Sequence, residues 1–216
     1  MNGKVSDGLT LTNYSAWVYI IGFNHNAERE GNCIAFQGFK TAQTGGTDIC
    51  LVDSGYGNKN TSGTWFNMNN SSTNAGGWSS SHMRSVVMPL IKAAFPADLQ
   101  AVIKTSTIYT DNTGGGTANV VPTATQDDVF LLAEYEIFGT RTYASMQEPN
   151  YLKQYAYYSA GNSKVKYKHN ATGTFANWRE RSPNSENPGT FCVVAGGGAN
   201  YATAASSYGV SPAFKV

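Results

Sequence analysis

Two glutamates two positions apart, Glu134 and Glu136, form the clearest pair of carboxylates in the sequence. Paired carboxylates can serve as a general acid and a general base when a fold holds them beside a reacting bond. No histidine is near them in the sequence. They follow a short apolar run, and the first turn of a helix favours acidic residues because of its dipole. We therefore expect a structural role for both.

The segment Glu148-Pro149-Asn150 offers carboxylate and amide oxygens, which are ligands that calcium prefers. It resembles the tripeptide with which many C-type lectins hold calcium and a mannose-like sugar. Those lectins also use a Trp-Asn-Asp sequence further along, where this chain has Asn177-Trp178-Arg179. Because proline is common at the start of a helix, a helix that begins here explains Pro149. A calcium-dependent sugar-binding lectin remains an alternative.

Other reactive side chains lack the spacing that catalysis or metal binding needs. His25, His82 and His169 are far apart and match no HExxH or His-x-His pattern. Ser54 is not in the Gly-x-Ser-x-Gly turn that exposes a hydrolase nucleophile. We therefore predict that the protein is not an enzyme and holds neither a metal ion nor another cofactor.

The composition predicts a neutral, polar surface on one domain. The chain has 216 residues, and charged residues make up 13% of them, about half of the usual share of roughly 25%. A net charge of +1 creates no field that would attract nucleic acid or anionic lipid. No apolar run approaches the ~20 residues of a membrane span, and no signal-peptide hydrophobic region is visible. We expect no nucleic-acid partner and no membrane insertion.

Three cysteines lie in separate apolar runs, which predicts buried free thiols. Lys164, Lys166 and Lys168 alternate with Val165 and Tyr167. This alternation favours the solvated face of a strand over an anion-binding patch.

The pattern of apolar residues predicts an α+β domain that is rich in strands at both ends and helical in the middle. Short apolar runs between turn residues predict strands at 17–23, 33–36, 48–52, 103–110 and 191–194, with a closing strand through Phe214. Apolar spacing predicts a helix from Met83 to Ala94, interrupted near Pro89. Further helices are expected at 97–102 and 151–159.

Residues 184–208 consist almost entirely of small and polar residues, with Glu186 as the single charge. Tyr201 and Tyr208 lie among them, and antibody loops use the same mixture because tyrosine supplies contact area at low entropic cost. An ordinary glycine-rich hairpin would have a similar composition. We interpret the stretch as a binding face.

The residues on either side of this face carry a family resemblance. Trp178, Arg181-Ser182-Pro183, Phe191-Cys192 and Gly209-Val210-Ser211-Pro212-Ala213-Phe214 resemble the C-terminal end of variable proteins diversified by diversity-generating retroelements. Upstream segments such as Asp48-Ile49-Cys50-Leu51-Val52-Asp53-Ser54 look like proteins of gut bacteria and their phages.

The resemblance implies one C-type-lectin-like domain over residues 1–216, of the formylglycine-generating-enzyme type. Such a domain has a mixed antiparallel sheet, helices in the middle of the chain and paired terminal strands. Phe191 and Phe214 would anchor the core, and Arg181 would satisfy buried backbone groups or an acid.

In that family, error-prone reverse transcription of adenines yields codons that do not encode Lys, Glu, Gln, Met or Trp. Residues 184–208 lack all of these except Glu186. We therefore place a variable ligand-binding region at 178–208. The residues expected to contact the ligand are Arg179, Asn184, Ser185, Asn187, Thr190, Val193, Ala195, Gly197, Tyr201, Ala202, Thr203, Ala204, Ser206 and Tyr208.

The resemblance implies a receptor-binding protein of a phage tail or a bacterial surface-display protein. Its expected location is the virion or the cell surface, and its expected partner is a protein or glycan on a host cell. Assembly into a homo-oligomer is a further possibility. A structural virion component is a further alternative. A formylglycine-generating enzyme would need two metal-binding cysteines near the C-terminus, where this chain has Cys192 alone.

Overall fold

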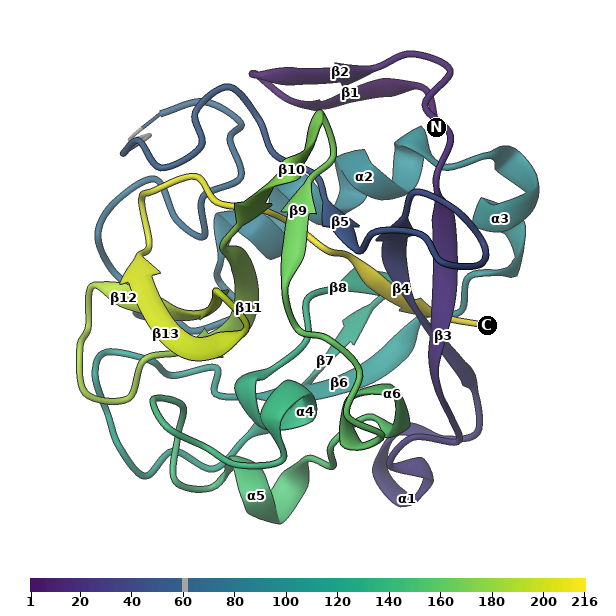
Figure 1. The fold of residues 1–216 in the computed structure, drawn as a ribbon. Coiled ribbons are helices and arrows are strands. Elements are labelled where there is room, and N and C mark those ends of the chain that lie inside the picture. The colour runs from purple at the N-terminus through teal and green to yellow at the C-terminus, as the bar shows by residue number, and fades with distance from the viewer. Residues whose placement is uncertain (60–61) are drawn as a thin grey trace.

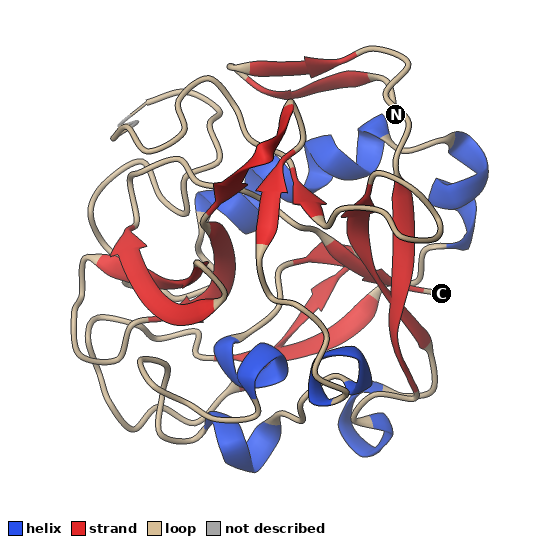
Figure 2. Ribbon diagram, in the orientation of Figure 1, coloured by secondary structure: helices blue, strands red, loops and turns tan. Residues whose placement is uncertain are grey.

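The central sheet of the fold joins both ends of the chain. The computed structural model describes residues 1–59 and 62–216 as an α+β protein made mostly of small sheets with a few short helices (Figures 1 and 2). The largest sheet has the order β3-β4-β14-β8, with antiparallel neighbours. Its strands are β3 (Trp17–Phe23), β4 (Ile34–Lys40), β14 (Ala213–Lys215) and β8 (Val129–Phe130). The expected strand at 17–23 and the closing strand are confirmed.

The expected pairing of the first and last strands is wrong. β1 (Gly3–Ser6) pairs with β2 (Leu9–Leu11), whereas β14 lies between β4 and β8. Phe214 accounts for this placement, because its ring is buried and stacks on Phe36 of β4 at a centroid distance of 5.4 Å. β1 is short and bulged, and it packs against α2 (Met88–Ala94).

The helix predicted from Met83 to Ala94 is confirmed, including its interruption near Pro89. A wider π-helical turn, η1 (Met83–Val87), precedes α2, and Pro89 lies in the first turn of α2. Proline fits there because the first helical N–H groups have no partner inside the helix. The next helix, α3 (Ala97–Val102), follows Pro96 as expected.

The single helix predicted at 151–159 is wrong. Two one-turn helices, α5 (Glu148–Tyr151) and α6 (Ala156–Ser159), are separated by an extended segment. The buried side chains of Leu152 and Tyr155 explain the break. The backbone N–H of Tyr155 donates to the carbonyl of Glu136, and its ring stacks on His25 at 3.6 Å.

The remaining small elements support these layers. They are α1 (Ala27–Glu30), the hairpin of β6 (Ser106–Thr110) and β7 (Thr123–Asp127), α4 (Glu134–Phe138), and a mixed sheet of β5 (Ile49–Cys50), β9 (Lys166–Lys168) and β10 (Ala171–Ala176). All three cysteines are buried and free. No helix in the described residues is long and apolar enough to cross a membrane.

Lys166 corrects the expectation of a solvated lysine face on β9. Its side chain is buried, and its Nζ donates to the hydroxyl of Tyr19 at 2.6 Å. The ammonium group also lies over the rings of Tyr19 and Trp178. Burial lowers the pKa of Lys166 to about 8. Two neighbouring lysines, Lys164 and Lys168, are half-buried.

A second sheet holds the C-terminal region that the sequence marks as a binding face. β11 (Trp178–Pro183), β12 (Thr190–Ala195) and β13 (Gly198–Thr203) form an antiparallel sheet in that order. Figure 1 shows this sheet on the side of the molecule opposite to β3. β11 is buried along its whole length, whereas β13 is exposed or half-buried.

A buried ion pair connects β11 to the centre of the fold. The guanidinium of Arg181 donates to both carboxylate oxygens of Glu136, at 2.6 and 2.7 Å, and to the carbonyls of Leu131 and Tyr109. Both side chains are almost fully buried. The expected framework role of Arg181 is therefore confirmed by its contacts.

Removal of one partner of a buried ion pair leaves an uncompensated charge in the core. We expect Arg181→Met to lower the free energy of unfolding by about 3–5 kcal/mol, measured by urea denaturation. Lys153→Ala, at an exposed position, is the control and should change it by less than about 0.5 kcal/mol. A loss below about 1 kcal/mol for Arg181→Met would contradict the central role of this pair.

Candidate binding face on β13

β13 presents the exposed part of the C-terminal sheet. Cys192 lies opposite Tyr201 in the register of β12 and β13, and Val193 lies opposite Asn200. The two β12 side chains are buried, whereas Asn200 is exposed and Tyr201 has 45% of its surface accessible. β13 pairs only with β12 among the described residues, so its other edge is open. We call the exposed and half-buried residues at 195–203 the β13 face.

The structure brings half of the expected contact residues to the surface. Those that are exposed or half-buried are Asn187, Ala195, Gly197, Tyr201, Ala202, Thr203 and Tyr208. Five of these seven belong to the β13 face. Asn187 lies in the loop between β11 and β12, and Tyr208 lies after β13.

The prediction is wrong for the other half of the expected contact residues. Arg179, Asn184, Ser185, Thr190, Val193, Ala204 and Ser206 are buried, so their side chains are not available to a ligand in this structure. β11 and β12 are the inner strands of this sheet and are almost entirely buried, whereas β13 forms its outer edge. Ala204 follows β13 at a point where its carbonyl accepts the N–H of Met68 and its own N–H donates to Gly189. Most of these buried residues are small or polar, and so are most residues of the β13 face, so residue type alone does not separate buried from exposed positions.

Arg179 is a support of the face and not a contact. Its guanidinium donates to the backbone carbonyls of Ala202, Thr203 and Ser206, at 3.3, 2.7 and 2.5 Å. It also lies 4.9 Å from the centre of the Tyr208 ring. No ion pair joins Arg179 to a carboxylate in the part of the chain that the structure describes, and burial lowers the pKa of Arg179 to about 9. Its hydrogen bonds fix the end of β13 from below through backbone atoms alone.

Asn74 supports the neighbouring loop in the same manner. Its amide group donates to the carbonyls of Asn184, Asn187 and Thr190, at 3.0, 3.0 and 2.8 Å. Its own side-chain oxygen accepts the N–H of Gly115 at 2.7 Å. A fully buried side chain thus holds the loop between β11 and β12 by its backbone.

Tyr143 lies beside the β13 face, although no motif in the sequence marks it as part of a binding site. Its ring packs edge-on against Tyr201, with 5.0 Å between the ring centres. Glu134 positions it, because this buried carboxylate accepts the N–H groups of Thr142, Tyr143 and Ala144 at 2.8 to 3.1 Å. The loop is distant from β13 in sequence, and no local signal could have placed it here.

The contacts of Glu134 and Glu136 agree with the structural role expected for both. Glu136 accepts the N–H of Ala133 at 2.9 Å and pairs with Arg181. Neither carboxylate faces solvent, since both side chains are buried.

Glu148 is a buried structural acid as well. The Ser182 hydroxyl donates to it at 2.5 Å, and the N–H of Tyr135 donates at 3.3 Å. Asn150 is exposed and donates to Gln147, so Glu148 and Asn150 do not point to a common surface site. Burial raises the pKa of Glu148 to about 8.

One group of side chains has the spacing of a metal site. Ligand atoms of His25, Glu30 and Glu136 lie within 4.8 Å of one another, and all three residues are buried. Each carboxylate already pairs with a cation, since Lys215 Nζ lies 2.6 Å from Glu30 and Arg181 lies 2.6 Å from Glu136. A divalent cation here would add positive charge to a neutralised cluster, so these residues do not fit a metal ion.

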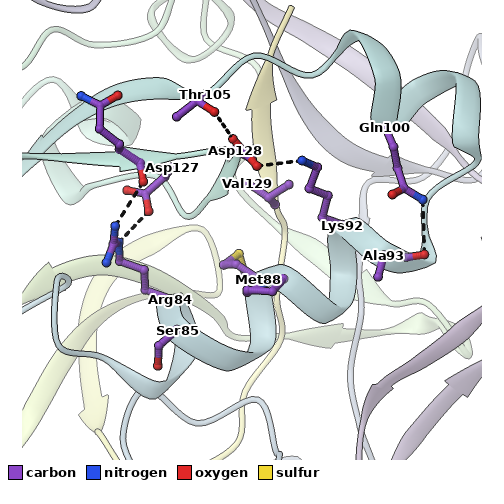
Figure 3. Close-up of a pocket in the computed structure, with 12 residues that line it drawn as sticks. Arg84, Ser85, Met88, Lys92, Ala93, Gln100, Thr105, Asp127, Asp128 and Val129 are labelled. Carbon is purple, nitrogen blue, oxygen red and sulfur yellow. Dashed lines mark hydrogen bonds and ion pairs between the residues drawn. The ribbon is translucent and has the colours of Figure 1, made fainter.

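A groove of about 580 Å³ lies away from the β13 face, between α2 and the β6–β7 hairpin (Figure 3). Arg84 pairs with Asp127 at 2.6 Å, and Lys92 pairs with Asp128 at 2.7 Å. Thr105 also donates to Asp128. The four charged side chains named here therefore form two ion pairs, and none of them is left as an unpaired acid or base.

The raised pKa of Glu148 predicts a pH dependence of stability. An acid whose folded-state pKa is raised contributes stability below its unfolded pKa, near 4.5, and loses it as the pH rises through about 8. Glu148→Gln cannot ionise, so its stability relative to the natural protein should increase by at least about 1.4 kcal/mol between pH 5 and pH 9. Denaturant unfolding at both pH values measures this, and an unchanged difference would contradict it.

Comparison with known proteins gives one family. A family model described as a domain of unknown function, DUF6273, matches residues 51–216, which include β11, β12, β13 and β14. No curated protein and no solved structure matches the chain. Because the matched region covers most of the sequence, the chain belongs to the DUF6273 family.

Proposed function

We propose that the protein is a ligand-binding protein with a C-type-lectin-like fold, and that its β13 face is diversified by a retroelement. The observation that carries this proposal is the way the face is held. Arg179 binds the backbone of its end at Ala202 and Thr203, and Asn74 binds the backbone of the loop between β11 and β12. Both act from the buried side, through carbonyl groups that every residue type has. Side chains on the outside can therefore change without loss of these bonds.

The chemistry of the face fits recognition of a protein or glycan surface. Tyr201 and Tyr143 form an aromatic pair. Asn187 and Asn200, which are close to Tyr201 in the sequence, have exposed side-chain amides. Tyrosine and asparagine together give contact area and adaptable hydrogen bonds without charge. The lack of charge on β13 favours a neutral ligand surface over an ionic one.

Tyr201 should be the main energetic contact, because aromatic residues dominate binding hot spots. We expect Tyr201→Ala to weaken binding by about tenfold or more, equivalent to about 1.4 kcal/mol. Binding of the labelled protein to a glycan array and to intact bacterial cells would be measured. Phe175→Ala removes another exposed aromatic ring, on β10, and is the matched control that should leave binding unchanged.

The same assay separates the alternatives. If Tyr201→Ala and multiple substitutions at 199–203 leave binding unaltered, a structural virion component becomes the better interpretation. If calcium raises the melting temperature and chelation abolishes binding, the calcium-dependent lectin is favoured.

Diversification predicts a mark in the neighbouring DNA. We expect a reverse transcriptase gene beside this gene and a near-copy of its 3′ end that differs mainly at adenines. The differing codons should be those of exposed residues such as Asn200 and Tyr201 and not those of Arg181 or Phe191. Sequencing of the locus tests this, and a locus without either feature would remove the diversification part of the proposal.

A further inference from the structure

β3 forms an open edge of the central sheet, on the side of the molecule opposite to the β13 face (Figure 1). It pairs only with β4 in the part of the chain that is described. Trp17, Ile20 and Phe23 are exposed by 48%, 43% and 65%. Edge strands usually carry charged residues or proline, which block pairing with another chain. The seven residues of β3 include neither.

An apolar pocket opens beside the first residues of β3. Its lining includes Tyr14, Ala16, Val18, Phe39, Phe95 and Leu99, and its volume is about 250 Å³. An apolar cavity of roughly 150 Å³ is large enough for benzene. The pocket therefore has room for the ring of one phenylalanine.

The strand and the pocket are complementary to a second copy of the same chain. We propose that the protein forms a two-fold symmetric homodimer through β3, in which Phe23 of each copy enters the pocket beside Val18 of the other. Val18, Ile20 and Phe23 pair with Gly38, Phe36 and Ile34, which alternate along β4, so these three side chains lie on one face of the sheet. An antiparallel pair centred on Ile20 therefore brings Phe23 of one copy to the Val18 end of the other. Because the projecting ring and the pocket lie at opposite ends of one strand, a two-fold axis satisfies both contacts at once.

The local backbone and charges agree with this arrangement. The register of β3 shifts between Trp17 and Val18 and again between Ile20 and Gly22. Strand pairing in the dimer is therefore confined to a short stretch at Ile20, and side-chain packing carries the rest of the contact. Lys40, opposite Trp17, pairs with Asp48 at 3.3 Å, and its charge is therefore compensated. The dimer leaves both β13 faces free, which would allow two-site attachment to a surface. The proposal does not depend on what the β13 face binds.

Sedimentation equilibrium over a wide concentration range tests the dimer directly. The natural protein should show a monomer–dimer equilibrium, and Phe23→Asp should raise the dimer dissociation constant by at least about tenfold. Phe175→Asp places the same charge at a ring of similar exposure, 59%, on β10, and should leave the equilibrium unchanged. A natural protein that stays monomeric, or equal effects of the two variants, would overturn the proposal.

A cross-linking experiment gives an independent measurement. Paired residues of antiparallel strands have Cα atoms about 4.5–5.5 Å apart, within the range that a disulfide spans. Ile20→Cys should therefore form a covalent dimer on mild oxidation. Val102→Cys, at an exposed position on α3, should remain monomeric, and the three natural cysteines are buried. Equal cross-linking of both variants would argue against a contact centred on Ile20.

Discussion

The buried ion pair of Arg181 and Glu136 is the interaction on which the arrangement of the sheets depends. It joins β11 to α4, and the same guanidinium binds carbonyls of Leu131 and Tyr109. A charge moved out of water is costly unless its partner and its remaining hydrogen bonds are all in place. The C-terminal sheet therefore takes its full stability only when the middle of the chain has folded against it.

A second buried group extends this constraint to both ends of the chain. Glu30 accepts from Lys215 and lies 3.2 Å from His25, so residues near the start and the end of the chain meet at one carboxylate. Glu180 on β11 is the contrast, since neither of its buried oxygens has a hydrogen-bond partner among the described residues, and burial raises the pKa of Glu180 well above the usual range. A neutral Glu180 avoids the cost of an unpaired buried charge.

Hydrogen bonds from buried side chains to the backbone explain why the C-terminal sheet can have a firmly held backbone and an outer face of small, uncharged residues. The side chains of Arg179, Asn74 and Glu134 form hydrogen bonds with backbone groups of the β13 face and its neighbouring loops. The shape of the face is then set by buried side chains, while its chemistry is set by exposed ones. This separation is what a binding surface with exchangeable residues requires, and the region that matches the DUF6273 family, residues 51–216, includes the whole C-terminal sheet.

The sequence by itself determined the elements whose side chains follow a regular period. The apolar runs of β3, β12 and β14 and the helical spacing around Pro89 were sufficient, because burial on one face produces that pattern locally. Only the tertiary structure decided which residues of 178–208 are exposed. Val193 and Ala202 are similar small residues on neighbouring strands, yet the first is buried and the second is accessible. Burial of Lys166 and the approach of Tyr143 to Tyr201 likewise depend on contacts between distant segments, which no local pattern encodes.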